Sequence, residues 1–221
     1  MIPTEGVATA HRRLYTLIED LTDDDVQTPS VLPGWTRGHV LAHVTDAGRA
    51  MVRLVEQALL GNQILLYDPA VEDRDGIIEA TAGRSADEHR AALREHSGRL
   101  EDVWTRVEDW TAPVRYRDGK ISSMVFARWR EVWIHATDLD LGLGPDAWPE
   151  DFCVHAIDFL QDRLPDGVAL RAGERTWLSG AEVSGDVHDL AAWLSGRFPG
   201  QNLTGTLPDL LPWPSAMPKS R

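Results

Sequence analysis

The sequence predicts an α+β protein in which an N-terminal four-helix bundle is followed by a small α/β domain. Long segments with a helical spacing of apolar residues, separated by substantial connections, predict the bundle over residues 1–144. A Gly- and Pro-containing stretch at 142–149 reads as a linker. Beyond it, short β-prone segments alternate with helical ones over 150–207, as is typical of a small α/β domain, and the Pro-rich tail at 208–221 is expected to be irregular.

The third helix of the predicted bundle has a recognisable start signal. Ser85, followed three residues later by Glu88, has the pattern of a capping box at the start of the third helix. The connection over 64–83 contains Pro, Gly and several acidic residues, and its length indicates a functional loop. A short hairpin is expected around Asp118-Gly119. The predicted long helices are, in chain order, 3–20, 37–60, 85–107 and 122–141.

The second domain is predicted from shorter segments. Val168-Ala-Leu-Arg and Thr176-Trp-Leu have the β-branched and aromatic content of strands, and Glu182-Val-Ser-Gly indicates a third, shorter strand. Helices are expected over 150–164 and from about Asp186 to Ser195.

Composition limits the kinds of partner. The formal charge of −13 argues against nucleic acid or an anionic membrane surface. The longest apolar runs are too short to span a membrane, and the N-terminus has no basic-then-apolar signal segment, so we expect a cytoplasmic protein. Cys153 is the only cysteine, so no internal disulfide is possible. We expect a monomer or weak homodimer that acts on small molecules.

The predicted fourth helix has a polar face that is flanked on both sides by apolar residues. Glu131 and His135 lie one turn apart on that face, together with Arg128 and Asp138, whereas Arg130 is expected on the opposite, solvent-facing side. Burial of charged side chains is costly unless they are paired or hold a metal ion. The helix therefore predicts either a Glu–His hydrogen bond in the core or a metal site.

His43 lies on the apolar inner face of the predicted second helix and can complete a metal site. With Glu131 and His135 it supplies two imidazoles and one carboxylate, a recurrent catalytic zinc set that leaves a fourth position open. The same set also suits non-haem iron(II). The sequence contains no HExxH motif.

Three separated segments resemble signatures of the mycothiol-dependent maleylpyruvate isomerase family, a branch of the DinB-like metal-binding bundles. The first is Leu32-Pro-Gly-Trp-Thr-Arg-Gly-His-Val-Leu-Ala-His-Val, and the second is Trp129-Arg-Glu-Val-Trp-Ile-His-Ala-Thr-Asp-Leu. The third is Ala181-Glu-Val-Ser-Gly-Asp-Val-His-Asp-Leu-Ala-Ala-Trp-Leu-Ser-Gly-Arg, near the end of the second domain. These segments occur in the family's order and span nearly the whole chain.

The resemblance implies a site and a reaction. It implies zinc, or another divalent metal, held by His43, Glu131 and His135, mycothiol as the thiol cofactor, and two substrate-binding arginines, Arg197 and Arg74. A zinc-activated thiolate would add to the cis double bond of maleylpyruvate, the resulting single bond would rotate, and expulsion of the thiolate would give fumarylpyruvate. The sulfur would then come from a small thiol rather than from the protein.

Three other functions remain open at this stage. A mycothiol S-transferase would use the same thiolate to conjugate an electrophile permanently, and would consume thiol stoichiometrically. A non-catalytic metal-binding module would have a closed fourth coordination position. Metal-assisted hydrolysis would use a metal-bound water as the nucleophile.

Overall fold

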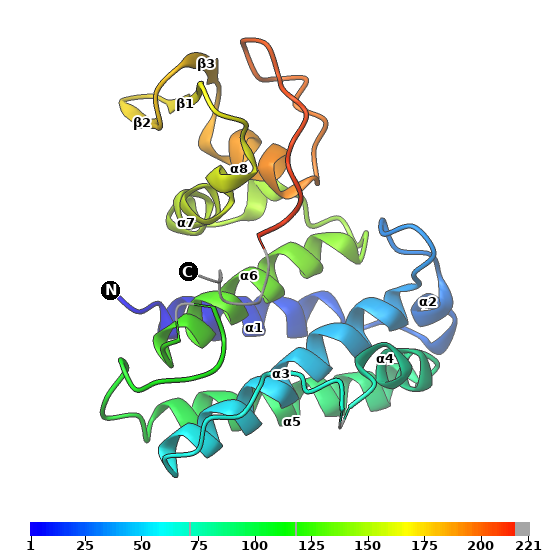
Figure 1. Cartoon of the computed structure of the whole chain (residues 1–221). Helices are drawn as coiled ribbons and strands as arrows, with labels where there is room; N and C mark the ends of the chain where they lie inside the picture. Colours follow the sequence, from blue (N-terminus) through cyan, green and yellow to red (C-terminus); the bar gives the residue numbers. More distant parts are fainter. Residues whose placement is uncertain (71, 118, 215–221) are drawn as a thin grey trace. The chain divides into compact units, whose positions relative to one another are not determined.

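The computed structural model describes residues 1–70, 72–117 and 119–214, and it divides into two compact units. The first unit contains residues 1–141 and the second begins at Gly142. Both units are drawn in Figure 1. No helix in the described ranges combines the length and the apolar character that a membrane span requires.

Four long helices form the first unit, and two short helices pack against them. Helices α1 and α3 each contact both α5 and α6, so the four long helices enclose one core (Figure 1). Short α4 packs on α3, and α2 contacts α3 and α5. The predicted helix bundle is therefore confirmed. The helices are α1 (Thr4–Leu17), α2 (Asp23–Gln27), α3 (Arg37–Leu59), α4 (Arg74–Ala82), α5 (Ala86–Trp104) and α6 (Ser122–Asp138).

Capping boxes fix where two of the long helices begin. At α5 the Ser85 hydroxyl accepts the backbone N–H of Glu88, and the Glu88 carboxylate accepts the backbone N–H of Ser85, as the sequence predicts. At α3 the Thr36 hydroxyl accepts the His39 N–H, and the His39 ring Nδ1 accepts the Thr36 N–H at 3.2 Å. His39 therefore has a structural role as the reciprocal partner of the helix cap.

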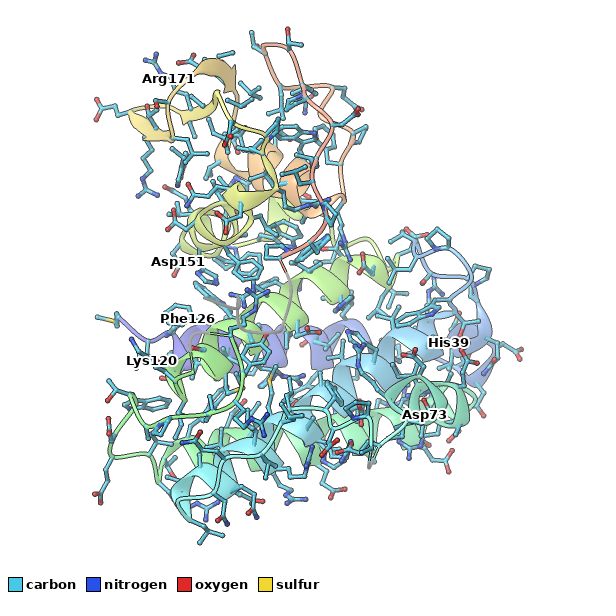
Figure 2. All side chains as sticks on the ribbon, viewed as in Figure 1. His39, Asp73, Lys120, Phe126, Asp151 and Arg171 are labelled. Atoms are coloured by element: carbon cyan, nitrogen blue, oxygen red, sulfur yellow. The ribbon has the colours of Figure 1, made fainter. Side chains whose placement is uncertain are left out.

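The sequence prediction missed α2 and α4. Residues 64–83 were expected to form a loop, but Arg74 is the first residue of α4, because the Asp73 carboxylate caps that helix by accepting the Gly76 N–H at 3.0 Å. Gly76 disfavours a helix locally, and burial of Ile78 against the body of the bundle outweighs that preference. Figure 2 shows Asp73 and His39 on the same side of the bundle.

The face of α6 that carries Arg130 is not exposed to solvent, contrary to the sequence prediction. Arg130 is 8% exposed and lies beside Tyr116, which belongs to the connection that precedes α6. Contact with an irregular segment leaves no periodic pattern in the helix sequence. The burial of Arg130 therefore could not be predicted from the helical spacing of α6. In the same connection the Val114 N–H donates to the Gly119 carbonyl, while Asp118, half of the predicted hairpin turn, lies outside the described residues.

The second unit combines two helices with a three-stranded sheet. The strand order is β2-β1-β3, with β1 antiparallel to β2 and parallel to β3, and α7 packs against α8 (Figure 1). The small sheet confirms the predicted α+β class. The elements are α7 (Glu150–Leu160), β1 (Val168–Ala172), β2 (Arg175–Trp177), β3 (Ala181–Ser184) and α8 (Val187–Ser195), with short 3-10 turns at Pro145–Ala147 and Gln161–Arg163.

Candidate metal centre

His43 on α3 and the pair Glu131 and His135 on α6 converge in the first unit. The His43 Nε2 atom lies 3.0 Å from the His135 Nε2 atom and 3.0 Å from the Glu131 Oε2 atom. The third edge, between His135 Nε2 and Glu131 Oε2, measures 3.5 Å. The helical faces deduced from the sequence therefore bring together one potential ligand atom from each side chain.

The spacing of these three atoms fits a tetrahedral metal ion. Ligands at 2.0–2.1 Å from zinc are about 3.3 Å apart at tetrahedral angles, and the edges of 3.0, 3.0 and 3.5 Å lie around that value. The Glu131 Oε2 atom is buried, and among the described residues it has no aligned hydrogen bond despite its closeness to His43. The donor set and this unsatisfied oxygen both fit a bound cation.

Electrostatics favour an ionised Glu131 beside neutral imidazole. Burial by itself would raise the pKa of Glu131, but the neighbouring His43, and after it His135 and Arg128, hold that pKa well below the ordinary range. Burial lowers the pKa of His43, an effect that Glu131 opposes. A carboxylate and a neutral imidazole are the protonation states that bind a divalent metal.

Asp138 orients His135 from the next turn of α6. The His135 Nδ1–H donates to the Asp138 Oδ2 atom at 2.8 Å, and Asp138 is fully buried. This contact places the proton on Nδ1 and leaves the Nε2 lone pair directed at the cluster, the usual arrangement of a metal-bound histidine. The sequence prediction placed Asp138 on the polar face without giving it a role, although its i+3 spacing from His135 was a usable signal.

Arg74 reaches the other histidine of the cluster. Its Nη2 donates to the His43 Nδ1 atom at 2.7 Å. A guanidinium has no acceptor atom, so this contact requires a lone pair on Nδ1 and a proton on Nε2. Metal coordination through the His43 Nε2 atom requires the opposite tautomer, and Arg74 would then need another acceptor. Of the two predicted substrate arginines, the structure brings Arg74 to the cluster.

The segment before α4 is tied to α3 by a shared carboxylate. Glu72 accepts a hydrogen bond from Arg49 on α3 and forms an ion pair with Arg53, whose Nη2 atom lies 2.6 Å from the Glu72 Oε1 atom. Arg53 also donates to the Leu66 carbonyl at 2.8 Å. These contacts attach Leu66 and Glu72, which precede α4, to α3. The Trp35 ring lies 5.7 Å from the His43 ring and lines another side.

A second buried polar cluster surrounds Arg128, one turn before Glu131 on α6. Arg128 is 0% exposed, and it donates to the His11 Nε2 atom at 2.9 Å, the Val44 carbonyl at 2.6 Å and the Ser97 hydroxyl at 3.0 Å. His11 in turn contacts the Glu101 carboxylate through its Nδ1 atom at 2.5 Å. Burial lowers the pKa of Arg128 to about 10, which still leaves it charged at neutral pH. The Arg128 cluster thus connects α6 to α1, α3 and α5.

Arg197 and Cys153 both belong to the second unit. Arg197 directly follows the end of α8, where its guanidinium lies 5.8 Å from the Trp213 ring centre. Its predicted role as a substrate arginine stays a prediction. Cys153 is buried in α7, and burial raises the pKa of its thiol to about 12. Cys153 is therefore a packing residue, not a thiolate nucleophile.

Comparisons with known proteins place this geometry in a family. Residues 7–140 match the family model described as the mycothiol maleylpyruvate isomerase N-terminal domain. The fold is similar to a crystal structure of the mycothiol-dependent maleylpyruvate isomerase and to that of a histidine-to-alanine mutant of it, each with TM-score 0.83, 22% sequence identity and 95% coverage of both chains. Comparison with curated protein sequences found no match. The matched region contains both helices of the candidate metal centre, and the chain belongs to the mycothiol maleylpyruvate isomerase N-terminal domain family.

Proposed function

We propose that this protein is a metal- and thiol-dependent cis–trans isomerase of the maleylpyruvate type, with mycothiol as the thiol. The convergence of His43, Glu131 and His135, with Arg74 beside them, is the observation that carries the proposal. A metal site next to a guanidinium suits a reaction that needs both an activated thiol and a bound carboxylate. Membership of the family supports the same reaction.

Three side chains would hold the metal. His43 and His135 would bind through Nε2 and Glu131 through its carboxylate, which leaves a position for an external ligand. Zinc in such a site lowers the pKa of a coordinated thiol, so that thiolate is present at neutral pH. Asp138 would keep His135 in the binding tautomer.

Arg74 would bind the substrate once the metal site is formed. When His43 carries its proton on Nδ1, that atom no longer accepts a hydrogen bond, and the guanidinium is released from it. A carboxylate of the substrate is the acceptor that best matches a planar guanidinium. We propose Arg197 as the second carboxylate-binding arginine, on the resemblance of the Ser-Gly-Arg segment that ends at this residue.

The reaction balances without an external reductant or oxidant. One C–S bond forms at the activated double bond, which becomes a single bond and rotates, and the same C–S bond then breaks to restore the double bond in the trans geometry. The thiol is regenerated, so the substrate and product are isomers. Buried Cys153 takes no part, in keeping with a sulfur supplied from outside the chain.

The test is to supply zinc-loaded protein with mycothiol and maleylpyruvate and to follow the trans isomer and free thiol together. The proposal expects isomer to form while the total thiol stays constant. Protein that binds zinc and yet forms no isomer contradicts it. Arg74→Ala should lower turnover with zinc retained, which separates substrate binding from metal binding.

A thiol transferase is the second candidate, because the same metal site and substrate arginines would serve it. In that reaction the C–S bond persists in the product. The discriminating observation is thiol loss equal to the electrophile converted, measured in the same assay with the protein limiting.

A further inference from the structure

Tyr67, in the connection between α3 and α4, has a buried hydroxyl whose hydrogen has no aligned acceptor in the described chain. Arg74 is near enough to the phenolic oxygen to lower its pKa as a donor, but a guanidinium cannot accept the phenol hydrogen. Arg53 on α3 donates to the carbonyl of Leu66, the residue before Tyr67, and also pairs with Glu72. Tyr67 is therefore a positioned donor with no acceptor.

Arg74 lies directly against Tyr67. The Arg74 guanidinium carbon is 5.1 Å from the centre of the Tyr67 ring, and the same guanidinium reaches the His43 Nδ1 atom. The Arg74 Nε–H is also buried and lacks an acceptor among the described residues. Two unsatisfied donors thus lie side by side next to the proposed metal ligands. Buried donors are costly to leave unpaired, which points to an acceptor supplied by a ligand.

Burial, together with the neighbouring carboxylates, raises the pKa of Tyr67 and keeps its hydroxyl protonated. Burial is the largest effect that raises the pKa of Tyr67, and the nearby Asp46 and Glu131 carboxylates raise it further, whereas Arg74 lowers it. The phenol therefore donates a hydrogen bond rather than carrying a charge. Asp46 is occupied on one oxygen by Arg49 at 2.8 Å, and its other oxygen is buried without a partner.

We propose that Tyr67 is a substrate-binding residue, donating its phenolic hydrogen to the carboxylate that Arg74 also binds. This inference rests on the proposed function for the identity of the ligand, and it assigns the second donor of that subsite. A carboxylate has enough lone pairs to accept from a guanidinium and a phenol together. The neutral phenol adds a hydrogen bond without adding charge beside the metal.

The experiment uses the zinc-loaded full chain and maleate, a cis dicarboxylate, as the probe in calorimetric titrations. Tyr67→Phe removes only the hydroxyl, and the dissociation constant for maleate should rise by about tenfold to a hundredfold, as expected for a hydrogen bond to a charged acceptor. The zinc content and melting temperature should stay at their wild-type values. Tyr116→Phe, which removes the hydroxyl of a buried tyrosine beside Arg130, is the matched control and should leave maleate affinity unchanged.

Catalysis provides a second readout. With maleylpyruvate, Tyr67→Phe should raise KM more than it lowers kcat, because the contact is present in the bound ground state. Unchanged maleate affinity in Tyr67→Phe, with zinc retained, would overturn the inference. It would indicate that the phenol donates its hydrogen bond to Asp46 instead of to the substrate. Isomerisation by the wild type together with that result would leave the proposed function standing. Weakened maleate binding in a protein that isomerises nothing would support the subsite and refute the proposed function.

Discussion

Two polar clusters are buried along α6, one turn apart, and they differ in how their hydrogen bonds are satisfied. Around Arg128 each nitrogen of the guanidinium has a protein acceptor, and the chain of contacts ends at the half-exposed carboxylate of Glu101. Around Glu131 two imidazole nitrogens and a carboxylate oxygen face one another at 3.0–3.5 Å, and that oxygen has no aligned hydrogen bond in the described chain.

The difference indicates which cluster is structural and which binds a ligand. A buried group whose partners are all supplied by the protein contributes to packing and fixes how the helices meet. A buried group left unsatisfied costs stability and persists where a ligand completes it. The Arg128 cluster therefore holds α1, α3, α5 and α6 together, and the cluster at His43, Glu131 and His135 is the one that we propose as the site of chemistry.

The largest expected effect is loss of metal from His43→Ala. Loss of a residue that only hydrogen-bonds to a metal ligand weakens metal affinity by about tenfold to a hundredfold. Removing one of the three ligands themselves should weaken zinc affinity by more than that. His39→Ala is the matched control, since His39 lies one turn earlier on α3 and serves the helix cap. Competition titration with a chelator measures both, and equal affinities in the two variants would contradict the assignment.

Arg128→Met should destabilise the fold more than Glu131→Gln does. The first change leaves His11, Ser97 and the Val44 carbonyl without their buried donor and should cost about 3–5 kcal/mol of unfolding free energy. The second removes a charge that His43, His135 and Arg128 stabilise but that makes no aligned hydrogen bond, so in metal-free protein it should cost less unfolding free energy than the first. Urea unfolding of the metal-free variants tests the contrast, and similar losses in both would refute it.

Acid should weaken the Arg128 cluster through His11. Burial is the main cause that lowers the pKa of His11, from 6.5 to about 4, and the Glu101 hydrogen bond only partly opposes it. The unfolded chain takes up this proton at a higher pH than the folded protein does. The free energy of unfolding therefore falls as the pH drops from about 6.5 to about 4, by about 3 kcal/mol in total. His11→Gln should be less stable at neutral pH and lose less stability across that window. Parallel slopes in the two proteins would contradict the assignment.

Asp138→Asn should give the smallest effect. The His135 Nδ1–H loses a charged acceptor, and zinc affinity should fall by about tenfold to a hundredfold while the helix stays folded. Thr137→Ser, a change at the neighbouring position of α6, is the control and should bind zinc as the wild type does. An Asp138→Asn protein with unaltered zinc affinity would show that this carboxylate serves packing alone.

Periodicity made the ligand faces predictable from sequence. Helix geometry alone places Glu131 and His135 on one face and His43 among apolar neighbours. The pattern is clear because both helices extend over many turns. Helix α4 was not predictable in the same way, because it is short and contains Gly76. Its packing against α3 is a tertiary effect.

The contacts between distant residues also escaped the sequence prediction. Nothing in the local pattern indicates that Arg74 meets His43 or that Arg128 meets His11, since each pair joins separate helices. The expectation that Arg130 faces solvent is wrong for the same reason, because it is 8% exposed and lies beside Tyr116, outside α6. The domain limits of 1–144 and 150–207 and the role of Arg197 stay predictions.

Anomalous diffraction at the zinc edge, from crystals of zinc-loaded protein, is the most direct test of the central claim. The account predicts a peak about 2.0–2.2 Å from the Nε2 atoms of His43 and His135 and from a Glu131 oxygen, with Arg74 turned away from the His43 Nδ1 atom. A zinc peak elsewhere, or the three side chains still in contact without one, would contradict it.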